Sequence, residues 1–272
     1  MQTSKRRCTG CWAEGKFASA LQLRRTTLRH PSNTRRGLEH RVDDRKNPMP
    51  PIDLSGTRVL VLGGSGELGT RIAGELRNRG AVVLATGRNA RRSGDPTESN
   101  MLEFDLLIDD PAQLIERTVE TLGGLDGVVN AAGVVAFGPF ETLSDDALNE
   151  LVKTNFTAPL RLLREAIPHI EGGFWVSITG VVAEQPVGGM AAYSAVKAGL
   201  SAATRALARE LRRRKIHLLD ARPPHTETGL ATRPIEGSPP TLPTGLDPDR
   251  VARLIVEGLA AGERELPSTQ FA

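Results

Sequence analysis

Cysteine is nearly absent from this sequence, and both copies, Cys8 and Cys11, lie within the first 48 residues. No disulfide is therefore expected in the rest of the chain, which fits a reducing cytoplasm. Aromatic residues make up only 4% of the 272, with a single tyrosine, so we expect a core of aliphatic residues and glycine, as parallel sheets often have. No apolar run approaches the roughly 18 residues of a membrane helix. No apolar segment follows Arg6-Arg7, as a secretion signal would require.

Charge is distributed unevenly along the chain. Residues 1–48 hold 12 Lys and Arg against 4 Asp and Glu, whereas residues 49–272 hold 23 against 28. The formal net charge of +3 therefore combines a basic N-terminal segment with a mildly acidic body. A body of this charge is not expected to bind nucleic acid. Nucleic-acid binding through residues 1–48 is a separate hypothesis, and it would show as salt-sensitive affinity.

The first 50 residues carry no helical or strand periodicity and end in a proline-rich run. We interpret 1–50 as a disordered basic extension and 51–272 as a single domain. Met49 begins a segment typical of a protein start. The extension therefore has three competing explanations: a start codon assigned too far upstream, a disordered tail, or a cleaved transit peptide. The cysteines lack zinc-finger spacing to the histidines of the extension, and we expect no metal site.

Apolar runs alternate with segments of helical spacing from residue 58 onward. This alternation predicts right-handed βαβ units. The expected fold class is α/β, a doubly wound parallel sheet (Rossmann fold) between two helical layers. The predicted strands are Arg58–Gly63, Ala81–Thr86, Met101–Asp105, Leu125–Asn130, Phe174–Ile178 and Ile216–Arg222. The predicted helices are Leu68–Arg79, Pro111–Leu122, a long helix from an N-cap at Ser144 toward Ile170, Met190–Arg214 and Asp247–Ala261.

A glycine-rich turn joins the first predicted strand to the first predicted helix. Gly64, Gly66 and Gly69 fit the dinucleotide-binding pattern Gly-x-Gly-x-x-Gly. Glycines let the backbone approach a pyrophosphate, and the helix N-terminus offers free N–H groups and a partial positive charge. The motif alone is weak, because a plain glycine-rich turn has the same letters. Its place between strand and helix favours a nucleotide site.

The only tyrosine, Tyr193, precedes Lys197 by four residues, a spacing that puts both on one face of a helix. An ammonium beside a phenol favours the phenolate, lowers the tyrosine pKa and makes a better proton donor near neutral pH. The alternative is an exposed lysine beside a half-buried tyrosine with no chemical role. The glycine-rich turn upstream favours the catalytic interpretation.

These motifs and three others resemble the short-chain dehydrogenase/reductase family over residues 49–265. Asn130-Ala-Ala-Gly133 follows the fourth strand, and Asn155 lies in the next helix. Tyr193-Ser-Ala-Val-Lys197 opens the fifth helix, and Asp105-Leu106 ends the third strand. The resemblance is to the single-domain branch of the family. It implies hydride transfer between a nicotinamide cofactor and a carbonyl or alcohol.

The resemblance also implies a role for each site residue. Tyr193 exchanges a proton with the substrate oxygen. Lys197 holds the nicotinamide ribose and lowers the tyrosine pKa, while Asn155 supports a water that relays protons toward Lys197. The residues expected to contact the cofactor are Gly63, Ser65, Gly66, Leu68, Gly69, Arg88, Asp105, Leu106, Asn130, Ala131, Ala132, Gly133, Tyr193, Lys197, Pro223 and Thr228.

The sequence departs from the family pattern in its glycine motif and its catalytic serine. Leu62 stands where the motif usually has Thr, and Glu67 replaces its middle glycine, so the phosphates are expected to sit slightly differently. The family's serine, thirteen residues before the tyrosine, is Gly180 here. We expect Thr179 to supply the missing hydroxyl. An enzyme that works without it is the alternative.

The loop after the sixth strand also differs from the family. Pro223-Pro224 replaces Pro-Gly, while Thr228 matches the threonine near the nicotinamide amide. His225 and Glu227 are weaker candidates for the substrate side, because a surface histidine is more often inert. A short, proline-rich lid over about 228–248 disfavours a large enclosed substrate. The usual seventh strand is barely present, so the subunit contacts that it often makes in the family are expected to be reduced.

The end of the second strand indicates the cofactor. An NAD-binding protein carries an acidic residue there for the ribose 2′-hydroxyl. Here residues 85–89 read Ala-Thr-Gly-Arg-Asn, followed by Arg91 and Arg92. Arg88 can stack on the adenine and pair with a 2′-phosphate. We therefore expect NADP(H), with NAD(H) as the alternative.

The main functional prediction is an NADP(H)-dependent oxidoreductase acting on a small-molecule carbonyl or alcohol, with Tyr193 as acid and base. We expect a cytoplasmic homodimer or homotetramer without a nucleic-acid or membrane partner. The alternative is a cofactor-binding protein with weakened catalysis and a regulatory or scaffolding role, which the missing serine favours. NADPH oxidation across a panel of carbonyl compounds distinguishes the two.

Overall fold

A computed structural model describes residues 50–88 and 100–272. The predictions for the basic extension, its boundary at Met49, and Arg91 and Arg92 lie outside these residues. The strands are β1 (Arg58–Leu62), β2 (Val82–Gly87), β3 (Met101–Glu103), β4 (Gly127–Asn130), β5 (Phe174–Ile178), β6 (His217–Ala221) and β7 (Glu265–Leu266). The α-helices are α1 (Glu67–Asn78), α2 (Pro111–Leu122), α3 (Asp145–Val152), α4 (Ala158–Ala166), α5 (Ala191–Glu210) and α6 (Pro248–Ala260).

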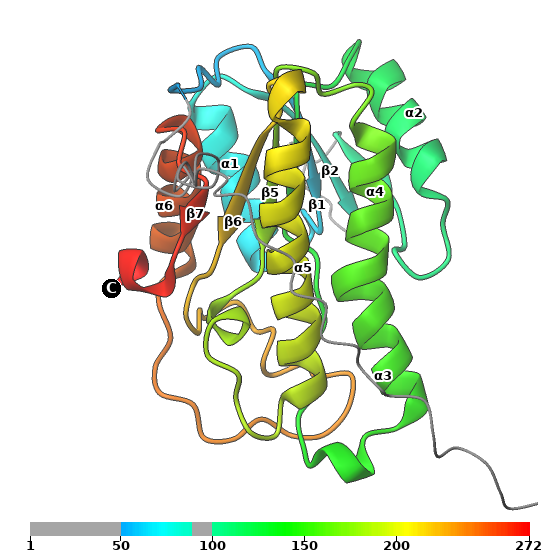
Figure 1. Ribbon diagram of the computed structural model, residues 1–272, viewed down its shortest axis with the longest axis vertical. Coiled ribbons are helices and arrows are strands. Elements are labelled where there is room, and N and C mark those ends of the chain that lie inside the picture. Colours follow the sequence, from blue (N-terminus) through cyan, green and yellow to red (C-terminus); the bar gives the residue numbers. More distant parts are fainter. Residues whose placement is uncertain (1–49, 89–99) are drawn as a thin grey trace, which may run out of the picture. The chain divides into compact units, whose positions relative to one another are not determined.

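The strands form one sheet in the order β3-β2-β1-β4-β5-β6-β7, and every neighbouring pair is parallel (Figure 1). The prediction of a doubly wound parallel sheet is therefore confirmed. The strand order runs in opposite directions from β1, toward β3 on one side and toward β7 on the other. In open α/β sheets, ligands bind at the carboxyl ends of the strands where the order reverses. A ligand site is therefore expected at the loops after β1 and β4.

Helices cover both faces of the sheet and divide the core in two. Helices α1 and α6 pack on one face against side chains such as Val59, Val61 and Leu219. Helices α2 and α4 pack on the other face, against Leu60 and Leu62 of the same first strand. Figure 1 shows α5 on the side of α4, opposite α1 and α6. The alternating residues of β1 therefore serve both layers, which explains why this strand is apolar throughout. Among the helices described, none is long and apolar enough to cross a membrane.

The six predicted strands are confirmed, with ends shifted by one or two residues, and the weak seventh strand has two residues beside β6. The predicted N-cap is confirmed as well, since the Ser144 hydroxyl accepts a hydrogen bond from the Ala147 amide at 3.1 Å. The long helix predicted toward Ile170 is interrupted. Residues Lys153–Thr157 form a π-helical turn between α3 and α4. Such turns add a residue to a helix and are frequent at functional sites.

A buried histidine on β6 makes the fold sensitive to acid. His217 is 3% exposed and its Nε2 lies 2.8 Å from the Glu263 carbonyl oxygen. Burial lowers the pKa of His217 to about 4 from 6.5. The unfolded chain therefore binds more protons between these pH values, and stability falls as the pH drops below 6.5. We expect His217 to account for a loss of about 2 kcal/mol in the free energy of unfolding between pH 7 and pH 5.

His217→Gln, which keeps a donor for the Glu263 carbonyl, is expected to remove most of that pH dependence. Urea unfolding at pH 7 and pH 5 measures it. His169, which is exposed, provides the control variant His169→Gln. A wild-type-like loss of stability in His217→Gln would show that other groups cause the acid sensitivity.

Candidate active site

The glycine-rich turn between β1 and α1 is packed too closely for side chains. A Cβ at Gly64 would lie 2.6 Å from the Ala85 Cβ, and one at Gly69 would collide with the Gly63 carbonyl oxygen. Gly63 has a φ of +70°, which favours glycine. Gly66 is the N-cap of α1 and offers no side-chain cap. This geometry fits a pyrophosphate at the helix N-terminus, where the helix dipole is positive.

The end of β2 lies beside this turn. A Cβ at Gly87 would come within 2.5 Å of the Ser65 hydroxyl oxygen, so the turn after β1 packs on the last residue of β2. Arg88 follows directly and is exposed. No carboxylate stands at residues 85–88. The end of β2 therefore offers a cation, and no carboxylate of its own, at the place where a dinucleotide would present its adenosine ribose.

Two further predicted cofactor segments follow β4 and β3, on either side of β1 and β2 in the sheet. Asn130, the last residue of β4, is 1% exposed, and its Oδ1 has no hydrogen-bond partner among the described residues. A buried polar atom without a partner is costly, so a ligand that donates to it would relieve that cost. Asp105, after β3, accepts a hydrogen bond from the Leu107 amide at 2.8 Å. Its carboxylate therefore also shapes its own turn.

Four elements bring the predicted catalytic residues together. The Lys197 Nζ lies 5.7 Å from the centre of the Tyr193 ring, one helical turn away on α5. It donates a hydrogen bond to the Ile178 carbonyl oxygen at the end of β5, at 2.9 Å. A Cβ at Gly133 would lie 3.5 Å from this Nζ and 2.9 Å from the Asn155 Oδ1. Glycine at 133 thus leaves the loop after β4 in contact with both polar side chains.

Asn155 fastens the π turn to the loop after β4. Its Oδ1 accepts from the Val134 amide at 3.2 Å, and its Nδ2 donates to the Val134 carbonyl at 3.0 Å. Nδ2 also donates to the Leu151 carbonyl at 3.1 Å. The side chain is 1% exposed. All of its recorded bonds are to backbone groups, so Asn155 sets the position of the loop that carries Gly133.

Burial, rather than the neighbouring charge, sets the pKa values of the Tyr193–Lys197 pair. Desolvation raises the pKa of Tyr193 to about 12. Desolvation also lowers the pKa of Lys197 to about 8, with an opposing effect from Asp220. The prediction that Lys197 lowers the tyrosine pKa is therefore wrong for the protein alone. The ring and the ammonium are both taken out of water, which disfavours the charged form of each. Tyr193 is a neutral phenol that can donate its proton.

Thr179 does not face a substrate. It is fully buried, and its hydroxyl donates a hydrogen bond of 2.5 Å to the Asp220 carboxylate. Asp220, on β6, also accepts from the Ser201 hydroxyl at 2.6 Å. The expectation that Thr179 replaces the family's serine is thus at odds with this geometry, because its one proton is already donated. Sequence reasoning missed Asp220, although an aspartate within an apolar strand was a visible signal.

The backbone conformation at residue 180 explains why glycine, and not the family's serine, stands there. Gly180 has a φ of +79°, and a Cβ there would meet only the Pro223 carbonyl oxygen, at 3.7 Å. Space is available, but this conformation is strained for a side chain. Serine at this position would therefore need the turn after β5 to change its course. The structure brings no hydroxyl other than that of Tyr193 to this point from the predicted set.

The candidates in the loop after β6 have mainly structural contacts. The Glu227 carboxylate accepts a hydrogen bond from the Gly245 amide at 2.6 Å and lies 3.6 Å from the His225 Nε2. Both residues line an open cavity of about 320 Å³ formed by the loop itself. The Thr228 hydroxyl accepts from the Leu230 amide at 3.4 Å. The Pro223 carbonyl accepts from the Val181 amide at 2.9 Å, which ties the loop after β6 to the turn after β5.

The predicted lid is attached to the loop after β4. The Ile235 amide donates to the Val135 carbonyl at 2.8 Å, and the Phe137 amide donates to the Glu236 carbonyl at 3.0 Å. The Glu236 carboxylate accepts hydrogen bonds from the Ser144 hydroxyl and, at 2.9 Å, from the Ser144 amide, and these contacts lower the pKa of Glu236. The middle of the lid therefore crosses residues 135–137 and contacts the N-cap of α3.

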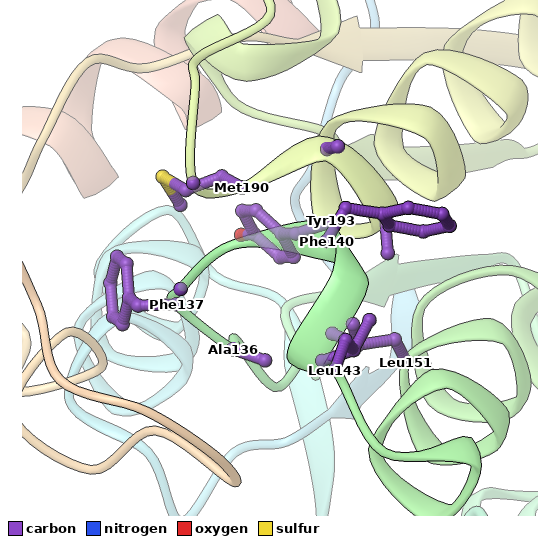
Figure 2. A pocket seen from close by; sticks show the side chains of 11 residues that line it. Ala136, Phe137, Phe140, Leu143, Leu151, Met190 and Tyr193 are labelled. Carbon is purple, nitrogen blue, oxygen red and sulfur yellow. The ribbon is translucent and has the colours of Figure 1, made fainter.

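A pocket opens beside Tyr193, between the loop after β4 and the start of α5 (Figure 2). Its lining side chains are hydrophobic apart from the phenol hydroxyl of Tyr193. Phe137 and Phe140 come from the loop after β4, Leu151 from α3 and Met190 from the turn before α5. The candidate proton donor thus lies at the boundary between an apolar pocket and the buried lysine.

Comparison with known proteins agrees with this arrangement. The family model for short chain dehydrogenases matches residues 57–237. The 3-oxoacyl-(acyl-carrier-protein) reductase of Escherichia coli is 30% identical over 188 residues, which cover 66% of this chain and 77% of that protein. Hydroxynaphthalene reductase arp2 of Aspergillus fumigatus is 32% identical over 179 residues, covering 62% and 66%.

A solved structure shows the same fold with a cofactor. A short-chain dehydrogenase from Burkholderia cenocepacia, crystallised in complex with NADP, is 28% identical with a TM-score of 0.67. The match covers 80% of this chain and 98% of that one. The chain belongs to the short-chain dehydrogenase/reductase family, oxidoreductases that act on carbonyl and alcohol groups with NAD(P).

Proposed function

We propose that this protein is an NADP(H)-dependent carbonyl reductase or alcohol dehydrogenase in which Tyr193 is the acid and base. The observation that carries the proposal is the convergence of Tyr193, Lys197, Asn155 and Gly133 at the carboxyl ends of β4 and β5. The glycine-rich turn after β1 opens at the same edge of the sheet. A cofactor held there and a substrate in the apolar pocket would meet at the Tyr193 hydroxyl.

The bound dinucleotide supplies or accepts the hydride. In the reducing direction, Tyr193 donates its proton to the substrate oxygen, and burial keeps the phenol neutral, with that proton in place, before the transfer. Lys197, with a pKa near 8, stays mostly protonated at pH 7 and stabilises negative charge on the phenol oxygen after transfer. Asn155 acts through the backbone of Val134, which it holds at two points.

The cofactor proposal concerns Arg88. This residue directly follows β2, is exposed, and has no carboxylate in the preceding strand end. The complex of the Burkholderia cenocepacia relative with NADP supports the same choice. Arg88→Asp is expected to weaken NADPH binding by about 10- to 100-fold, as loss of a charge-assisted contact does, and to leave NADH binding nearly unchanged. Fluorescence titration of both cofactors measures the ratio, with Arg77→Asp on α1 as the control. An unchanged NADPH/NADH ratio in Arg88→Asp would exclude Arg88 from the cofactor site.

One observation favours a second candidate function, an NADP(H)-binding protein with weak catalysis. The Thr179 hydroxyl is bound to Asp220, so Tyr193 lacks a second donor to the substrate oxygen among the predicted residues. One such donor contributes about 10²–10³ in rate in other enzymes. NADPH oxidation across a carbonyl panel tests the choice. Turnover that depends on Tyr193 supports the enzyme, whereas tight NADPH binding without turnover supports the binding protein. A cytoplasmic homodimer or homotetramer remains our proposal for its assembly.

A further inference from the structure

The pocket beside Tyr193 carries no charge. Its walls come from the loop after β4, from α3, and from the turn that leads into α5 (Figure 2). The Tyr193 hydroxyl is the only side-chain oxygen among the lining residues, and there is no side-chain nitrogen. Among side chains, a group that enters this pocket therefore meets one hydrogen-bonding group, and the other side chains offer only carbon and sulfur.

We propose that this pocket binds the apolar substituent of an uncharged ketone or secondary alcohol whose oxygen meets the Tyr193 hydroxyl. This inference rests on the function proposed above for Tyr193. A carboxylate or phosphate in the pocket would lose its hydration without gaining a cation, which is costly. An alkyl or aryl substituent gains from leaving water. The wall thus selects neutral ketones and esters over anionic keto acids.

Phe140 is the side chain that a substrate would cover. It lines the pocket, yet 64% of it is exposed. Val187, in the turn that carries Met190, is also exposed, at 43%. Two large apolar side chains open to water on the segments that form one pocket indicate a ligand-contacting surface. Covering them releases water from apolar area, which favours binding in proportion to the area buried.

The free space in the pocket is about 10 Å³, room for about one water molecule. A hydrogen bond of 2.9 Å from the Gly138 amide to the Gly189 carbonyl ties its two walls together. A substituent therefore enters by displacing side chains. Met190 is unbranched and adapts its shape readily, and Phe140 has solvent beside it. Slender alkyl chains fit this mode of entry better than rigid polycyclic groups.

A matched pair of substrates tests whether the pocket prefers neutral compounds to anionic ones. Reduction of ethyl 3-oxobutanoate and of 3-oxobutanoate is followed by NADPH absorbance, together with methyl ketones from 2-butanone to 2-octanone. We expect kcat/KM for the ester to exceed that for the acid by at least about tenfold. We also expect kcat/KM to rise by about fourfold for each added methylene that is buried. Binding is measured on the same samples as a thermal shift in the presence of NADP⁺.

Phe140→Lys is expected to reduce the ester-to-acid ratio by about tenfold or more, because it places a cation at the pocket wall. Val82→Lys is the control. Val82 is 47% exposed at the first residue of β2, at the opposite edge of the sheet from the site, and the ratio should not change. Equal or better use of the acid by the unmodified protein would overturn the inference while leaving the proposed function intact.

The two proposals can fail separately. If neither compound is reduced but the ester alone raises the melting temperature, the pocket assignment stands and the proposed reaction is wrong. If neither compound is reduced and neither raises the melting temperature, the pocket assignment is wrong as well. A ratio that falls equally in Phe140→Lys and Val82→Lys would show that the added charge acts at long range rather than in the pocket.

Discussion

Tyr193→Phe is expected to slow hydride transfer by about 10²–10⁴-fold, the usual contribution of a positioned acid or base. The variant removes the only side-chain oxygen of the apolar pocket. The ring keeps its packing against the hydrophobic cluster around Val135 and Leu151, so the fold should be unaffected. Single-turnover oxidation of bound NADPH, with a neutral ketone in excess, measures the rate of the chemical step directly.

Cofactor binding provides the control for this variant. NADPH affinity should change little, because the variant keeps every other cofactor contact proposed above, including Lys197 on the same helix. A phenylalanine variant that transfers hydride at the unmodified rate would remove Tyr193 from the mechanism. The family resemblance would then describe the fold and the cofactor, and the proton would have to come from elsewhere.

Lys197→Met is expected to abolish most activity and to make the protein more stable. Burial lowers the pKa of Lys197 from 10.5 to about 8, so keeping the ammonium inside the fold at pH 7 costs about 3 kcal/mol. Methionine has a similar volume and no charge. The hydrogen bond that the Lys197 ammonium donates to the Ile178 carbonyl, worth about 1.5–3 kcal/mol because the donor is charged, is lost. The net gain of up to about 1.5 kcal/mol should raise Tm by up to about 5 °C.

The pH dependence of stability tests the cause. The folded pKa of Lys197 lies below its unfolded value, so the unfolded chain binds more protons between pH 8 and pH 10.5. The stability of the unmodified protein should therefore rise through this window, and Lys197→Met should lack the rise. A destabilised Lys197→Met would mean that the hydrogen bond to Ile178 outweighs the cost of burying the charge. Lys153→Met, in the π turn and exposed, is the matched control.

The glycine-rich half of the candidate site was predictable because part of its constraint is local. The positive φ of Gly63 and the contact of Gly69 with the Gly63 carbonyl belong to a single strand–turn–helix unit, which seven consecutive residues reveal. Gly64, by contrast, packs on Ala85 of the neighbouring strand. The Tyr193–Lys197 pair could also be predicted, since helical geometry alone puts residues four apart on one face. The doubly wound parallel sheet followed from the alternation of strands and helices, which leaves few topologies open.

The parts that the sequence did not predict depend on distant residues. Thr179 looked available for catalysis, but Asp220, 41 residues further along, accepts its proton. The pKa of Tyr193 was predicted to fall because its neighbour in sequence is a cation. It rises because the loops around it exclude water, and burial is a property of the whole fold. The interruption of the helix from Ser144 did have a signal in the sequence, because Pro159, just after the π turn, cannot donate the backbone hydrogen bond of a regular helix.

The π turn is a place where the deletion of a single residue is expected to change the candidate site. A π turn closes over one more residue than an α turn, so Lys153–Thr157 contain a residue that regular helix would not need. Losing one of the four residues other than Asn155 would bring α3 and α4 toward a single helix that is kinked at Pro159, which lacks the backbone donor of a regular helix. The Asn155 position would then rotate by about 100° about the helix axis and leave the backbone of Val134. A single deleted codon in this segment is therefore expected to yield a folded protein whose loop after β4 has lost its anchor.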